Sequence, residues 1–215
     1  MKEHIKDIRD QLRHVYWIGG GSGAGKSTVS RHIADKHGLQ VYATDDVMPD
    51  HAKRSTPESC PLLHAFISMD MDERWLSRAP QEMLETFHWF QGEGFDMIVE
   101  DLLSLPADKP VIAEGFRLLP HLVAPLLARP ENAVWLLPVT EFRKAVFADR
   151  WGEDGGFVAK TSDRAQALCN LLARDAMFTD RLQEETARIG MTAIEVNGAL
   201  TVEGLAGRIE KQFEL

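Results

Sequence analysis

Short apolar runs alternate with amphipathic stretches along the whole sequence. Five of these runs predict buried strands because they are short, apolar and bounded by helical or turn patterns; they are HVYWIG (14–19), LQVYA (39–43), VIAEG (111–115), AVWLLP (133–138) and TAIEVN (192–197). Helical spacing follows the first run, where Val29, Ile33 and Ala34 share one face before Gly38 ends the pattern. Strands that alternate with helices predict an α/β fold: a parallel sheet, helices on both faces, and a ligand site at the carboxyl ends of the strands.

Length and composition agree with one acidic globular domain. The chain has 215 residues and a net charge of −9, so we expect a single domain, 1–215, with a sizeable core and no nucleic-acid-binding surface. Its two cysteines, Cys60 and Cys169, form no CxxC motif, which argues against a disulfide framework or a zinc ribbon. No apolar run is long enough to cross a membrane, and the charged N-terminal segment differs from a signal peptide. We therefore expect a cytoplasmic protein without a membrane partner.

A glycine-rich stretch separates the first predicted strand from the helix that follows it. GGSGAGKS, residues 20–27, fits the pattern G-x-x-x-x-G-K-[ST], whose backbone N–H groups cradle phosphates at the amino end of a helix. Lys26 would then reach the terminal phosphates, and the Ser27 hydroxyl would ligate Mg²⁺. The alternative is a glycine-rich turn with an accidental Lys-Ser pair, but the strand–helix context favours phosphate binding. The predicted nucleotide-binding residues are Gly20, Gly21, Ser22, Gly23, Ala24, Gly25, Lys26, Ser27 and Thr28.

The motif that accompanies a guanine site is missing from the sequence. N-K-x-D does not occur, and EVNGA (195–199), at the end of the fifth predicted strand, lacks its Lys and Asp. The third predicted strand ends in Glu114, where motors and large ATPases usually carry an aspartate. We therefore expect ATP and Mg²⁺ as cofactors.

The order of these motifs resembles the P-loop small-molecule kinases. GGSGAGKSTVSRHIADKHGLQVYATDD, VIAEG, AVWLLP and FADRWGEDGGF look like segments of the shikimate, gluconate, uridine and nicotinamide riboside kinases and of chloramphenicol phosphotransferases. Such kinases have five parallel strands in the order 2-3-1-4-5, a substrate-binding segment after the second strand and a mobile lid before the fifth. The resemblance implies a three-layer P-loop NTPase fold here, with a helical substrate cap at about 47–110 and a lid at about 150–165.

The resemblance also implies roles for charged residues at two strand ends. In ATDD, Asp45 or Asp46 would accept the proton of the substrate hydroxyl or help to position the metal, and we favour Asp45. Asp46 could instead be a turn or capping residue. Glu114 would touch Mg²⁺ through water, and Arg117 would hold an anionic part of the substrate or the transferring phosphoryl group. The alternative for both is a solvated strand terminus. The predicted metal-binding residues are Ser27, Asp45 and Glu114, and the predicted substrate-binding residues are Asp45, Asp46 and Arg117.

The lid and the cap are defined less sharply. Arg150 would neutralise charge on the γ-phosphoryl oxygens, whereas the other arginines of this region are interpreted as solvated or paired on helix surfaces. In the cap, Arg54, Arg74, Arg78 and His88 are candidates for ligand contact. Because a stripe of Met and aromatic residues is usually core, and a lone histidine is usually structural, we interpret His88 as structural.

Together these expectations describe an ATP- and Mg²⁺-dependent kinase that phosphorylates a hydroxyl group of a small molecule. Its predicted catalytic residues are Lys26, Asp45 and Arg150. Two other functions are compatible with such a loop: a nucleotide-gated regulatory ATPase, and a zeta-toxin-like nucleotide-sugar kinase. Sugars, antibiotics, nucleosides and phosphorylated acids are all acceptors that this scaffold holds by changing its cap, and the sequence leaves the oligomeric state open.

Overall fold

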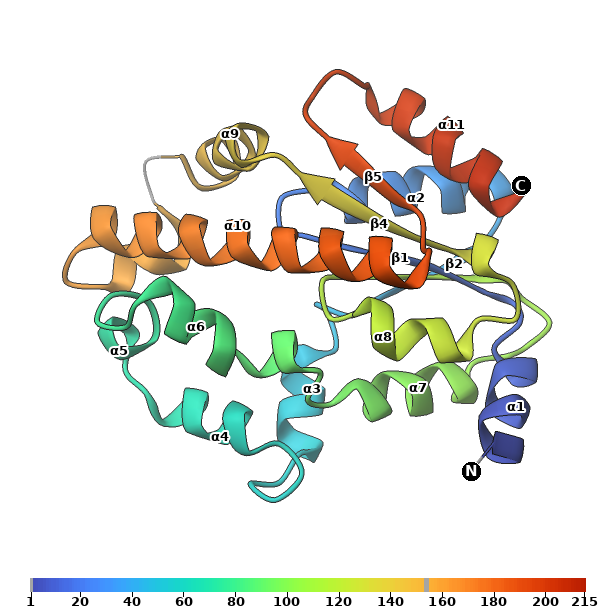
Figure 1. Ribbon diagram of the computed structural model, residues 1–215, viewed down its shortest axis with the longest axis horizontal. Helices are drawn as coiled ribbons and strands as arrows, with labels where there is room; N and C mark the ends of the chain where they lie inside the picture. The colour runs from blue at the N-terminus through green and yellow to red at the C-terminus, as the bar shows by residue number, and fades with distance from the viewer. Residues whose placement is uncertain (1, 153–154) are drawn as a thin grey trace.

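A five-stranded parallel sheet forms the centre of the structure. The computed structural model describes residues 2–152 and 155–215, and its strands are β1 (Val15–Gly20), β2 (Gln40–Ala43), β3 (Val111–Glu114), β4 (Ala133–Pro138) and β5 (Ala193–Val196). They lie in the order β2-β3-β1-β4-β5, and every neighbouring pair is parallel (Figure 1). This confirms the predicted α/β fold and the predicted strand order.

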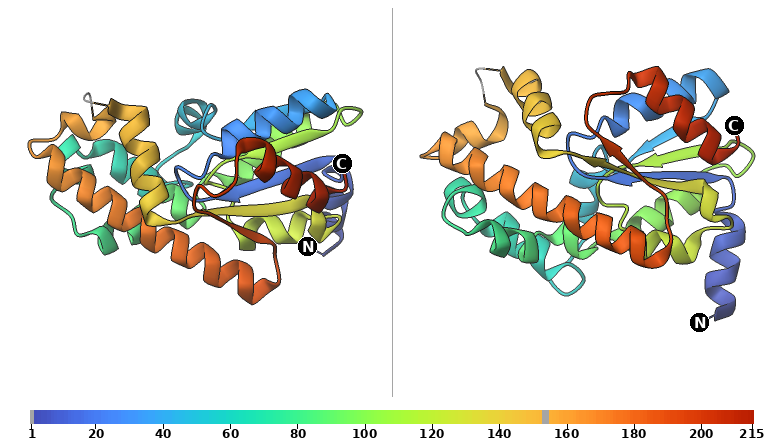
Figure 2. Two further views of the ribbon diagram at one scale, coloured as in Figure 1. Left: turned by 90° about the horizontal axis from the view of Figure 1, so that it is seen from above. Right: turned by 45° about the horizontal axis from the view of Figure 1, so that its top comes forward.

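Alternate residues of the central strands pack on opposite faces of the sheet, which makes three layers. Trp17 and Trp135 belong to one apolar core, whereas Ile18 and Val134 belong to a second. Helices α2 (Lys26–His37) and α11 (Val202–Phe213) cover the second core, and α7 (Phe95–Ser104), α8 (Pro120–Val123) and α10 (Arg164–Ile189) cover the first. Figures 1 and 2 show these two groups of helices on opposite sides of the sheet. Because both faces are covered, the central strands are apolar almost throughout.

The chain between β2 and β3 forms a group of short helices beside α10. They are α3 (Met48–Arg54), α4 (Pro61–Ser68), α5 (Met71–Trp75), α6 (Pro80–Thr86) and the 3₁₀ turn η1 (His88–Gln91), followed by α7. Local signals start several of them: a proline stands in the first turn of α3, α4 and α6, and a reciprocal capping box joins Asp70 and Glu73 at the start of α5. Figure 1 shows α4, α5 and α6 beyond the end of the sheet, where the predicted cap of 47–110 was expected.

The remaining elements are α1 (Lys2–Gln11), the 3₁₀ turns η2 (Ala124–Leu126) and η3 (Pro130–Asn132), α9 (Thr140–Trp151) and the 3₁₀ turn η5 (Gly156–Lys160). The lid predicted at about 150–165 corresponds to the end of α9, η5 and the start of α10. Its residues 153 and 154 lie outside the described part of the chain. Within 2–152 and 155–215, no helix combines the length and the apolar character that a membrane crossing needs.

Candidate active site

The loop between β1 and α2 has the backbone geometry that phosphate binding requires. Gly20 has a φ of 126° and lies so close to the backbone of Leu136 that a Cβ atom would collide with its carbonyl group. Gly25 stands directly before α2 in the left-handed conformation, with a φ of 76°. The two glycines allow the chain to leave a buried strand and enter a helix through a short, tight loop. The positive end of the α2 dipole therefore lies at this loop.

Lys26 is the first residue of α2 and is almost fully buried. Its Nζ donates a 2.9 Å hydrogen bond to the carbonyl oxygen of Gly21, within the loop. Burial lowers the pKa of Lys26, and the negative charges of Asp45, Glu114 and Asp175 oppose this shift. Three carboxylates from three different parts of the fold thus surround one lysine.

Glu114 ends β3 beside the start of α2 and is only 3% exposed. Burial raises the pKa of Glu114, and a hydrogen bond with Ser27 and the charge of Lys26 oppose this shift. A hydroxyl and a carboxylate in contact at a phosphate loop are the oxygen donors that Mg²⁺ uses when it also keeps waters and phosphate ligands. Within the described residues, no cluster of three or more His, Cys, Asp and Glu forms a metal cage of its own. The donor set therefore fits a magnesium ion that arrives with a nucleotide.

The two adjacent aspartates after β2 differ in their surroundings. Asp45 is exposed, as Asp46 is, but desolvation by the nearby protein still raises its pKa, against the charges of Lys26 and Arg117. Its carboxylate lies 3.5 Å from the hydroxyl of Thr44, which donates to it. Asp46 is exposed, and its backbone N–H donates to the carbonyl of Ala43 within a turn. The preference for Asp45 stays a prediction, which its charge interaction with Lys26 supports.

Arg117 lies beneath the site and not on its surface, which differs from the predicted substrate contact. The residue is 2% exposed, and its guanidinium group donates to the carbonyls of Thr44 and Gly94 and to Nδ1 of His51 at 2.9–3.2 Å. It also stacks over Trp89, 4.0 Å from the ring centre. Burial lowers the pKa of Arg117 to about 10, so the group stays charged at neutral pH. Arg117 is placed to support the backbone that carries Asp45.

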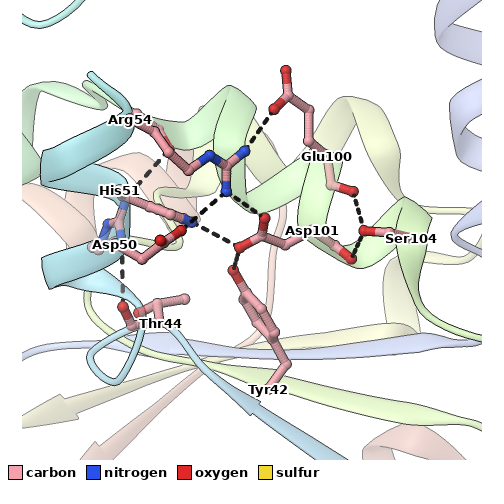
Figure 3. A network of polar contacts seen from close by, with 10 residues as sticks. Tyr42, Thr44, Asp50, His51, Arg54, Glu100, Asp101 and Ser104 are labelled. Atoms are coloured by element: carbon pink, nitrogen blue, oxygen red, sulfur yellow. Dashed lines mark hydrogen bonds and ion pairs between the residues drawn. The ribbon is translucent and has the colours of Figure 1, made fainter. Parts of the chain in front are cut away.

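His51 connects Arg117 to a polar network between β2, α3 and α7. Because an arginine can only donate, Nδ1 of His51 accepts, and its Nε2–H donates to Asp101 at 2.7 Å. Asp101 also accepts from the Tyr42 hydroxyl at 2.7 Å and from Arg54 at 2.8 Å; Figure 3 shows this convergence. Burial acts to raise the pKa of Asp101, but the hydrogen bonds from Arg54, His51 and Tyr42 hold it below its usual value.

Two arginines of α9, Arg143 and Arg150, differ in burial and in hydrogen bonding. Arg143 is fully buried, and its guanidinium group donates to the carbonyl of Ser22 at 3.1 Å and to the hydroxyl of Thr179. Arg150 is exposed, and its charge is close enough to lower the pKa of Lys26. Its guanidinium group has no hydrogen bond or ion pair with any residue of 2–152 or 155–215. Arg143 therefore contacts the loop directly, while the role of Arg150 stays a prediction.

An aromatic cavity of about 280 Å³ opens beside the phosphate loop. It lies between the cap, α9, η5 and α10, and one residue of the loop forms part of its wall. Two other hollows along α10, of about 430 and 350 Å³, have no residue of the loop in their walls. The residues that line the aromatic cavity are Ser22, Met48, Phe66, Trp75, Phe87, His88, Trp89, Phe90, Phe116, Phe147, Arg150, Trp151, Phe157, Leu171, Arg174 and Asp175.

The sequence analysis missed Asp175, which faces both Lys26 and this cavity. A signal was nevertheless present in α10, where Leu171, Phe178 and Leu182 mark the buried stripe of the helix. Arg174 and Asp175 occupy the same stripe at positions where apolar residues are expected. A charged pair on a buried face indicates a functional or specificity role, and here it reaches the candidate site.

Comparisons with known proteins give structural neighbours of low similarity. No family model matches the chain, and no curated protein matches its sequence. An uncharacterized protein from Eubacterium ventriosum has a TM-score of 0.45 and 13% identity, over 93% of this chain and 97% of its own. A gluconokinase from Sinorhizobium meliloti has a TM-score of 0.46 and 17% identity, over 94% of this chain and 93% of its own. The function of this chain is therefore argued from its own residues.

Proposed function

We propose that this protein transfers the γ-phosphoryl group of ATP to a hydroxyl group of a small molecule, with Mg²⁺ as cofactor. The observation that carries the proposal is the proximity of three parts: a loop with the G-x-x-x-x-G-K-[ST] pattern, a buried lysine whose pKa three carboxylates influence, and a cavity of about 280 Å³ lined by Ser22 of the loop and by one of these carboxylates, Asp175. The loop provides a site for the nucleotide. The cavity provides a separate site for the second reactant, which a transferase needs and a simple hydrolase does not.

The loop and the strand ends have the groups that hold a nucleotide and its metal. The backbone N–H groups of 21–27 and the amino end of α2 would bind the phosphates, and Lys26 would exchange the carbonyl of Gly21 for phosphate oxygens. Ser27, together with Glu114 through water, would hold Mg²⁺. When bound, this ion withdraws charge from the phosphoryl oxygens.

The acceptor side of the reaction is assigned to Asp45 and Arg150. In the transfer, the acceptor oxygen bonds to the γ-phosphorus while the bond from that phosphorus to the β–γ bridging oxygen breaks, and ADP keeps the electron pair. Asp45 would orient the acceptor hydroxyl and take its proton, and its raised pKa makes it a stronger base than an exposed aspartate. Arg150 would approach the transferring group from the cavity wall.

The cap argues for a transferase over a nucleotide-gated regulatory ATPase. A regulatory ATPase would need a surface for a partner protein after β2. The helices that follow β2 line the aromatic cavity instead. We therefore retain phosphoryl transfer as the proposed function.

The proposal is tested by Lys26→Met, which keeps the aliphatic stem and removes the charge. ADP production from MgATP in the presence of a panel of alcohols is expected to fall by at least about 10²-fold, because one charged donor to the transferring group is lost. Thermal unfolding checks that the variant is folded. Lys36→Met is the matched control, since Lys36 lies on the same helix, is mostly exposed and pairs with Glu210. A folded Lys26→Met protein with the turnover of the wild type would refute the kinase function.

A further inference from the structure

Aromatic residues form more than half of the wall of the cavity beside the phosphate loop. The rings come from the cap, from the segment after β3, from α9 and from η5. They contact one another in tilted, edge-to-face and stacked pairs; for example, Trp75 is tilted against Phe157 at 4.8 Å, and Phe147 stacks on Trp151 at 4.6 Å, between ring centres. Such walls favour a flat apolar ligand. Each contact between two aromatic rings adds about 0.5–1.5 kcal/mol to the free energy gained by burying their apolar surface.

Five polar residues interrupt the aromatic wall: Ser22, His88, Arg150, Arg174 and Asp175. Two of them, His88 and Arg174, keep a buried atom without a partner among the described residues. Arg174 is 4% exposed and bonds Asp175 through Nε and Nη2 at 2.7–3.0 Å, but its Nη1 has no partner in the described structure. His88 is 2% exposed, and its Nδ1 is likewise without a partner among the described residues. An unsatisfied buried polar atom costs about 1–3 kcal/mol, so each atom would gain from a ligand that supplies the missing bond. Both atoms have almost no exposed surface, so a ligand reaches them only when neighbouring side chains of the wall move.

The charges around these two groups limit the kind of ligand. Asp175 neutralises Arg174, whose guanidinium group also lies over the rings of Phe87 and Phe90, 4.6 and 4.9 Å from their centres. Burial and the neighbouring arginines lower the pKa of His88 to about 3, so its ring is neutral near pH 7. Arg150 adds a positive charge at the wall, but the part of the cavity lined by His88, Arg174 and Asp175 has hydrogen-bonding capacity and little net charge. That part matches a neutral hydrogen-bond acceptor better than an anion.

We propose that the acceptor is a compact aryl alcohol: a planar apolar body, one hydrogen-bond-accepting group directed to Arg174 and His88, and a hydroxyl directed to the loop. The inference rests on the proposed function, because it names the substrate class of the same site. The small volume of about 280 Å³ limits the ligand to a compact molecule. A polyol or sugar acid is disfavoured, because each hydroxyl set against an aromatic wall without a partner costs free energy of binding.

Three neutral or polar probes test this class. They are 4-acetylbenzyl alcohol, which has a ring, a carbonyl and a primary alcohol; 4-isopropylbenzyl alcohol, which keeps the shape but lacks the carbonyl; and D-gluconate. Binding is measured by calorimetry without nucleotide, and ADP production is measured separately with MgATP. We expect the acetyl compound to bind about tenfold more tightly than the isopropyl compound, which is the worth of one hydrogen bond, and D-gluconate not to bind at the same concentrations.

Phe157→Ala and Ile67→Ala provide matched variants with little risk to folding. Phe157 is 37% exposed at the cavity wall, whereas Ile67 is 48% exposed and is not a lining residue. Loss of the Phe157 ring is expected to weaken binding of the acetyl compound about fivefold, and loss of the Ile67 side chain is expected to leave it unchanged.

The outcomes separate this inference from the proposed function. Binding of the aryl probes without stimulated ADP production supports the ligand class and contradicts the kinase function. Stimulation of ADP production by D-gluconate but not by the aryl alcohols contradicts the ligand class and leaves the kinase function standing. Equal affinity for the acetyl and isopropyl compounds, or no binding of either, overturns the inference.

Discussion

Neighbouring residues of one type can have different roles when their surroundings differ, and Asp45 and Asp46 are such a pair. Both are exposed, but desolvation raises the pKa of Asp45, whose charge also interacts with Lys26, whereas the backbone of Asp46 bonds to Ala43 within the turn. Only Asp45 combines a raised pKa with a position facing the buried lysine. The contrast makes Asp46 a natural control for Asp45.

Asp45→Asn preserves the size of the side chain and removes its charge and basicity. We expect the rate of acceptor-dependent ADP production to fall by about 10²–10⁴-fold, the usual loss when a general base is removed. The affinity for ATP should change far less, because the loop and Lys26 are intact. Parallel measurements of ATP binding and turnover check both statements. Asp46→Asn is expected to retain most of the activity, and a larger loss at Asp46 would exchange the two roles.

Local sequence is enough to predict some of these residues and not others. Residues 20–27 could be recognised as a candidate phosphate loop because the glycines, the lysine and the serine lie in one continuous segment between a strand and a helix. Arg117 could not be placed, because its partners Thr44, His51 and Gly94 are far away in sequence, and their contacts decide that it is buried. Charge type alone does not distinguish a supporting arginine from one that contacts substrate.

At the scale of elements, the polar network around Asp101 joins the strand that carries Asp45 to two helices. Tyr42 belongs to β2, His51 to α3 and Asp101 to α7. These hydrogen bonds hold α3 against the end of the sheet, next to Asp45. The network thereby fixes the connection from which the cap begins.

Asp101→Asn tests how much this network stabilises the fold. We expect the free energy of unfolding at pH 7 to fall by about 2–4 kcal/mol, because several charge-assisted hydrogen bonds are weakened together. The lowered pKa of Asp101 also sets the direction of the pH dependence. Its stabilisation is fully present above the ordinary aspartate pKa of about 3.9 and is lost as the pH falls below that value, through the lower folded pKa.

Denaturant unfolding at several pH values between 7 and 2.5 measures both effects. The stability of Asp101→Asn should decrease less than that of the wild type below about pH 4. Glu100→Gln is the control, since Glu100 pairs with the same Arg54 from an exposed position and is expected to contribute less than about 1 kcal/mol. Equal losses in the two variants would mean that Asp101 acts only as another surface partner of Arg54.

The elements of the sheet were predictable, while those of the cap were not. Each strand is a short apolar run between helical patterns, and a few residues are enough to recognise such a run. The cap consists of short helices whose positions depend on proline starts, one capping box and contacts with α10. The aromatic residues of 47–110 were interpreted as core, and many are buried. Several of them also line the cavity, a double role that spacing alone does not reveal.

At the scale of the whole molecule, the candidate site lies where the carboxyl ends of the strands, the cap and α10 meet. The loop, Asp45 and Glu114 follow or end neighbouring strands, and Asp175 reaches the same lysine from α10. Nucleotide bound here would connect the sheet to the helices around it. Binding should therefore stabilise the native state as a whole.

This leads to a prediction for thermal unfolding with nucleotide. At a concentration about 100 times its Kd, MgATP adds about 2.7 kcal/mol to the stability of a protein that binds it only when folded. For a chain of this length, each kcal/mol raises Tm by about 2–4 °C, so a rise of about 5–10 °C is expected. ATP without Mg²⁺ should give a smaller rise, because Ser27 and Glu114 then bind no ion. Lys26→Met should lose most of the effect.

GTP should stabilise no more than ATP, since the exit of β5, around 196–198, has no carboxylate to read guanine. A larger rise with GTP would overturn the choice of nucleotide, and no rise with either nucleotide would overturn phosphate binding by the loop.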